Sequence, residues 1–116
     1  MTSEITARSF RFRDDWEHDF VRHSMLNQFV CRFPNGYGVS VVQGFGTYGA
    51  EDGLFELAVT VYAEGNDIHD FALTYNTPIT DDIIGRLTVD QVAETMERVA
   101  SLLPTTRAAN ILDQGV

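Results

Sequence analysis

A glycine-rich stretch offers the most specific spacing in the chain. The glycines of residues 44–49 fit the pattern G-x-G-x-x-G, whose backbone N–H groups can cradle a phosphate. A dinucleotide site of this type opens a helix inside a βαβ unit, whereas this stretch leads into a predicted strand. A kinase-type loop does join two strands but works with a lysine, and the chain has none. We therefore interpret residues 44–49 as a contact loop that displays Phe45 and Tyr48.

Histidine, cysteine and paired carboxylates are the other groups that could do chemistry. His18 and His23 are five residues apart, a spacing that does not place two metal ligands on one helical face. Cys31 stands in an apolar run, which favours a buried thiol over a nucleophile. Asp81 and Asp82 could form a catalytic pair, but we interpret them as favourable charges at the start of a helical turn. We expect no catalytic residue, cofactor or metal.

Acidic residues are concentrated in the second half of the chain. Eleven lie between residues 51 and 97 beside one arginine, a net of −10, while residues 1–50 sum to zero and residues 98–116 to +1, which gives −9 in total. A field of this sign repels nucleic acid and attracts basic proteins. The predicted interaction surface consists of Tyr37, Phe45, Tyr48, Glu51, Asp52, Asp90, Glu94 and Glu97.

Length and composition predict a single domain over residues 1–116. A chain of this size that is 44% hydrophobic can bury one core without a metal or a disulfide. We expect neither a secretory leader nor a membrane span, because the first thirty residues hold no apolar core behind a basic start and no later apolar run is long enough to cross a bilayer. The expected location is therefore the cytoplasm, without membrane contacts.

One helix organises the predicted fold. Apolar residues recur at helical spacing over residues 88–103, Thr88 and Gln91 fit a capping box, and Pro104 ends the helix. This stripe must lie on a sheet, which turns Glu94 and Glu97 toward water. The stripe contains Val89, Val92, Ala93, Met96, Val99, Ala100 and Leu103.

Four strands are predicted ahead of this helix. Turn residues at 34–38 and 64–67 divide the segments into antiparallel hairpins of a meander. The strands are expected at 29–33, 39–42, 54–62 and 68–75, and alternation assigns to the helix-facing side Phe29, Cys31, Phe33, Val39, Val41, Phe55, Leu57, Val59, Val61, Phe71, Leu73 and Tyr75.

The opposite side of the sheet is too apolar to be fully solvated. It includes Val42, Ala58 and Tyr62, so we expect either an N-terminal helix or a second copy of the chain to cover it. The second case predicts a homodimer.

The N-terminal helix is predicted over Asp14–Leu26. Asp14 and Glu17 fit a capping box, and Trp16 and Phe20 are one helical turn apart. Residues 1–13 are expected to form an arm or an edge strand, residues 77–85 a connector with one turn capped by Thr80, and residues 105–116 a tail. The predicted class is α+β: a four-stranded antiparallel sheet, a C-terminal amphipathic helix and an N-terminal helix.

Three segments resemble short uncharacterised proteins encoded by actinobacteria and their phages. They read FPNGYG at 33–38, DGLFELAV at 52–59 and LTYNTPITDD at 73–82, and the likeness extends over roughly residues 29–103. The resemblance implies an origin and carries no functional residue over to this chain.

The leading functional hypothesis is a non-enzymatic acidic module that binds another protein, as a phage or prophage accessory protein acting on a host protein. One alternative is a small ligand-binding protein or enzyme with a pocket between helix and sheet, using Tyr75, His69 or Asp81. Another is a DNA mimic, which would require the acidic residues to stand in a double row.

Overall fold

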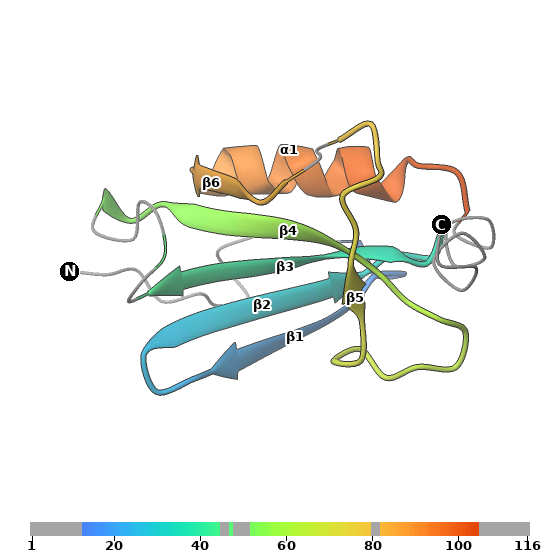
Figure 1. Ribbon diagram of the computed structural model, residues 1–116, viewed down its shortest axis with the longest axis horizontal. Coiled ribbons are helices and arrows are strands. Elements are labelled where there is room, and N and C mark those ends of the chain that lie inside the picture. The colour runs from blue at the N-terminus through green and yellow to red at the C-terminus, as the bar shows by residue number, and fades with distance from the viewer. Residues whose placement is uncertain (1–12, 45–46, 48–51, 80–81, 105–116) are drawn as a thin grey trace.

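The chain folds into an antiparallel sheet with one helix packed on it, as seen in a computed structural model that describes residues 13–44, 47, 52–79 and 82–104. The strand order is β1-β2-β3-β4-β5, and β6 also pairs with β4 (Figure 1). The α+β class is confirmed, but the predicted number of strands is too low. The elements are β1 (Glu17–Arg22), β2 (Leu26–Arg32), β3 (Tyr37–Gly44), β4 (Phe55–Val61), β5 (Ala72–Leu73), β6 (Ile84–Leu87) and α1 (Val89–Ala100).

Helix α1 begins where the sequence predicts. The Thr88 hydroxyl accepts the N–H of Gln91 at 3.2 Å, and Gln91 Oε1 accepts the N–H of Thr88 at 2.9 Å, so the capping box is confirmed. The helix ends at Ala100, one turn earlier than predicted, and Leu103 is exposed. The apolar stripe therefore contributes to the core through its middle rather than along its whole length.

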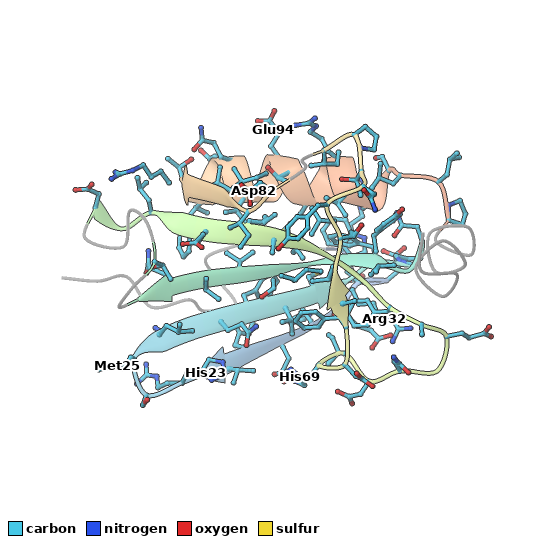
Figure 2. All side chains as sticks on the ribbon, in the orientation of Figure 1. His23, Met25, Arg32, His69, Asp82 and Glu94 are labelled. Atoms are coloured by element: carbon cyan, nitrogen blue, oxygen red, sulfur yellow. The ribbon has the colours of Figure 1, made fainter. Side chains whose placement is uncertain are left out.

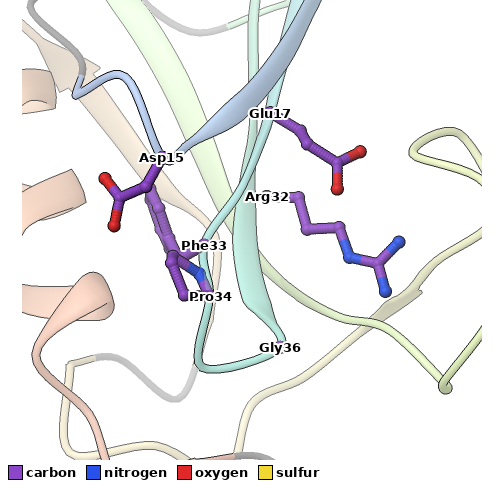
Figure 3. Close-up of a pocket in the computed structure, with 6 residues that line it drawn as sticks. All are labelled: Asp15, Glu17, Arg32, Phe33, Pro34 and Gly36. Atoms are coloured by element: carbon purple, nitrogen blue, oxygen red, sulfur yellow. The ribbon is translucent and has the colours of Figure 1, made fainter.

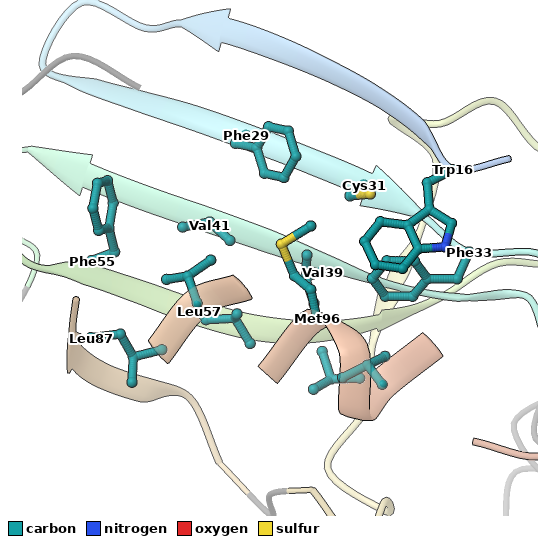
Figure 4. Packing of buried hydrophobic residues seen from close by; sticks show 13 residues of the cluster. Trp16, Phe29, Cys31, Phe33, Val39, Val41, Phe55, Leu57, Leu87 and Met96 are labelled. Carbon is teal, nitrogen blue, oxygen red and sulfur yellow. The ribbon is translucent and has the colours of Figure 1, made fainter. Parts of the chain in front are cut away.

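The core lies between α1 and the sheet side that we call the helix face (Figure 4). Val92, Met96 and Val99 of α1 are fully buried there, as the helical spacing predicts. Burying such side chains contributes about 1.5–3 kcal/mol each. The predicted strand residues that join this cluster are Phe29, Cys31, Phe33, Val39, Val41, Phe55, Leu57 and Val59.

The predicted helix over Asp14–Leu26 is wrong, because this segment supplies β1 and the start of β2. A spacing of four residues fits both the helical and the strand period, so Trp16 and Phe20 share one side of a strand equally well. Their rings pack on the helix face, 4.7 Å from Phe33 and 4.8 Å from Phe29 respectively between ring centroids. Pairing with β2 outweighs the local capping signal.

Of the fourth predicted strand, at 68–75, only the two residues of β5 are in a strand. Its register pairs Thr60 with Leu73, which places Leu73 on the side opposite the helix face. Leu73 and Tyr75 are 40% and 42% exposed, so their assignment to the core is wrong. Phe71 lies just before β5, with its ring 5.8 Å from that of Tyr62, and is not part of the core cluster, so its assignment is also wrong.

The side opposite the helix face, called here the far face, is partly covered by the β4–β5 connection, residues 62–71. Tyr62 is 2% exposed, and its hydroxyl donates to the Ile68 carbonyl at 2.7 Å. At the other end, His69 Nε2 lies 2.8 Å from an Asp19 carboxylate oxygen on β1, and in Figure 1 the connection reaches the level of β1. The β4–β5 connection thus covers this part of the far face, and Tyr62 is not available to a second copy.

Strand β6 is an addition to the predicted strands, and it begins within the segment 77–85 for which the sequence predicts a connector. It pairs with β4 across an irregularity in register between Phe55 and Leu57. Arg86, within this bulge, has a φ of 58°, in the left-handed region that non-glycine residues rarely adopt. Its guanidinium lies 3.7 Å from the Asp52 carboxylate in an exposed ion pair.

Replacing Arg86 by glycine should relieve this backbone strain. We expect Arg86→Gly to be about 1 kcal/mol more stable than Arg86→Ala, because alanine retains the Cβ that disfavours positive φ. Both variants lose the same exposed ion pair, so their difference isolates the backbone term. Urea denaturation of the two proteins measures it, and equal stabilities would contradict the strain.

Some predictions fall on residues outside the described ranges. These are the arm before Arg13, the cap at Thr80, the tail at 105–116, and the loop side chains of Phe45, Tyr48 and Glu51.

Candidate functional site

The outer face of α1 is the part of the predicted interaction surface that the fold assembles. Because Val92, Met96 and Val99 are buried, the rotation of the helix about its axis is fixed. Asp90, Glu94 and Glu97 therefore all face solvent, and Figure 2 shows Glu94 pointing away from the sheet. We call these three residues the acidic row.

Two arginines form ion pairs with acidic residues of the predicted interaction surface. Arg13 Nη2 donates to Glu97 Oε2 at 2.6 Å, joining residues 84 positions apart in the chain, and Arg86 pairs with Asp52. Both pairs are exposed, so each contributes at most about 1 kcal/mol to stability. The acidic half of the sequence is thus partly neutralised by a residue from the N-terminal half, which sequence position alone could not reveal.

Tyr37 is only partly exposed. It begins β3 and packs against the core cluster in a partly buried position, and burial raises the pKa of its hydroxyl. Tyr37 is therefore less exposed than expected of a contact residue. Of the eight predicted surface residues, Asp52, Asp90, Glu94 and Glu97 are exposed.

Cys31 is placed as the sequence predicts, in the middle of β2 with its side chain in the core. It is fully buried, and this burial raises the pKa of the thiol to about 12. The thiol therefore stays protonated at neutral pH and has little nucleophilic character.

The three histidines lie in different surroundings. The His18 ring lies 5.7 Å from that of Phe20 on the helix face, His23 Nε2 is 2.8 Å from Gln28 Oε1, and His69 contacts β1 from the β4–β5 connection. Within the described ranges, no group of three or more histidine, cysteine or acidic side chains is placed to hold a metal ion.

Of the residues suggested for a pocket between helix and sheet, the two that the structure describes, His69 and Tyr75, do not meet there. His69 lies on the far face, Tyr75 is largely exposed, and Asp81 is outside the described residues. The core side chains of α1 and the helix face fill the intervening space. The arrangement therefore gives little support to a site between these layers.

Sequence reasoning missed a different pair of polar residues, Asn35 and Arg32. Asn35 Nδ2 donates to the carbonyls of Val99 and Leu102 at the end of α1, at 2.9 and 3.1 Å. The guanidinium of Arg32 lies 4.6 Å above the Tyr62 ring. The only sequence signal was that Asn35 stands in a Pro-Asn-Gly turn, which predicts the turn and not the contact.

Comparisons of the chain with family models, with curated proteins and with solved structures found no match. In the described part of the chain, no helix combines the length and apolarity that crossing a membrane requires.

Proposed function

We propose that the protein is a non-enzymatic interaction module that binds a basic surface of another protein through the acidic row of α1. The observation that carries this proposal is that one side of the helix is buried and the other side carries the acidic row. Val92, Met96 and Val99 are fully buried in the core, so a rigid element holds the outward-facing acidic row. Among the described residues, Glu94 makes no ion pair.

The resemblance to short proteins of actinobacteria and their phages supports a more specific version. In it, the chain is a phage or prophage accessory protein, and its partner belongs to an actinobacterial host cell. On α1 itself the acidic residues form a single row at positions i, i+4 and i+7, whereas a DNA mimic needs a double row, so the described residues of this helix favour the protein-binding module.

Reversing the charge of Glu94 should weaken partner capture. Glu94→Lys changes the net charge from −9 to −7, and Glu64→Lys in the β4–β5 connection makes the same change away from α1. We expect capture from an actinobacterial extract to fall with Glu94→Lys and to remain at the wild-type level with Glu64→Lys. Quantitative mass spectrometry of the retained proteins gives the comparison.

Salt supplies the second readout of the same experiment. The Debye length shortens from about 10 Å at 0.1 M to about 3 Å at 1 M, so an electrostatic complex should dissociate as salt rises. A partner whose retention survives both high salt and Glu94→Lys would contradict the proposal. Equal losses with the two lysine variants would show that net charge, rather than the acidic row, controls capture.

A further inference from the structure

Glu17 and Arg32 are direct neighbours across β1 and β2, and their side chains share the far face. Opposite charges in this position usually stabilise a sheet by pairing. Here Arg32 is engaged elsewhere: its guanidinium stacks over Tyr62, and Nη1 donates to the Asn66 carbonyl at 2.6 Å. Within the described residues, the Glu17 carboxylate has neither a hydrogen bond nor an ion pair.

Gly38 explains why Arg32 takes this position. It is the β3 neighbour of Arg32, and a Cβ added there would come within 2.9 Å of the Tyr62 ring and 2.3 Å of the Cys31 carbonyl oxygen. The missing side chain lets Tyr62 lie close over the sheet and offer its ring to Arg32. The guanidinium is thus fixed before any ligand arrives, which lowers the entropic cost of binding.

A hollow of about 300 Å³ opens beside these two charges (Figure 3). This volume is at the lower end of small-molecule sites. In Figure 3, Glu17 and Arg32 extend in the same direction from neighbouring strands. The lining residues are Asp15, Glu17, Arg32, Phe33, Pro34 and Gly36.

We propose that this hollow binds a small zwitterion of the α-amino acid type. The ligand's ammonium group would lie against the Glu17 carboxylate, and its carboxylate would accept from the guanidinium of Arg32. A simple cation would be repelled by Arg32, and a simple anion by the Glu17 carboxylate, so these two side chains select a ligand that carries both charges. This binding is independent of the acidic row on α1.

The probe for this site is L-leucine, titrated into the full-length protein and followed by amide chemical shifts. We expect saturable shifts at Glu17, Arg32 and Gly36. N-acetyl-L-leucine lacks the ammonium group and L-leucine amide lacks the carboxylate, so each should bind about tenfold more weakly or worse. Equal binding of all three compounds, or no saturable shift with leucine, would overturn the proposal.

Glu17→Gln tests the residue assignment with little risk to folding, because the side chain is exposed. We expect it to weaken leucine binding about tenfold, while Glu64→Gln, which removes one negative charge elsewhere, should leave binding unchanged. Unaltered binding in Glu17→Gln would place the ligand outside this hollow and would also overturn the assignment.

Discussion

Met96→Ala is expected to lower the free energy of unfolding by about 2–5 kcal/mol. Met96 is fully buried at the centre of the contact between α1 and the helix face. Truncation removes apolar contacts with the sheet and leaves a cavity, because the surrounding strands can relax only in part. Urea denaturation followed by circular dichroism measures the loss.

Arg98→Ala is the matched control for this change, because Arg98 lies on the exposed side of the same helix. We expect it to alter the free energy of unfolding by no more than about 0.5 kcal/mol. If Met96→Ala were as mild as Arg98→Ala, α1 would have to pack on the sheet through another face.

Asn35→Asp is expected to destabilise the protein by more than Asn35→Ala, which itself should cost about 1–3 kcal/mol. Asn35 Nδ2 donates to two carbonyls at the end of α1, while Oδ1 accepts the N–H of Tyr37 at 2.9 Å. Aspartate preserves the bond to Tyr37 but turns a carboxylate oxygen toward carbonyl oxygens at the negative end of the helix dipole. Alanine removes the donor without adding this repulsion.

The cost of Asn35→Asp should also depend on pH. The nearby carbonyls favour the protonated form of the introduced carboxyl, so its folded-state pKa should exceed the ordinary value of about 3.9. Stability relative to the wild type is then greatest below pH 3.9 and falls as the pH rises through the folded-state pKa. Asn35→Ala has no such group, and its cost should stay constant. Denaturation curves at acidic and neutral pH measure the cost of each substitution. A cost of Asn35→Asp that did not change with pH would contradict the prediction.

The sequence by itself determined the elements whose signals are local. The capping box at Thr88 and Gln91 involves residues three positions apart, so the start of α1 could be predicted. The same helical period separated buried Met96 from exposed Glu94, which located the acidic row. The turn at 34–38 likewise defined the β2–β3 hairpin, because its residues favour turn conformations wherever they stand.

Only the tertiary structure decided the features that depend on distant partners. Trp16 and Phe20 fit a helix and a strand equally well, and pairing with β2 selected the strand. The Arg13 contact with Glu97 and the Asn35 contact with α1 join segments 84 and 64 residues apart. Such contacts form only when folding brings distant segments together. Periodicity and turn signals describe neighbouring residues, so they cannot predict these contacts. The hollow beside Glu17 also depends on a distant partner. Its two opposite charges stay apart because the Arg32 guanidinium stacks over Tyr62, thirty residues further along the chain.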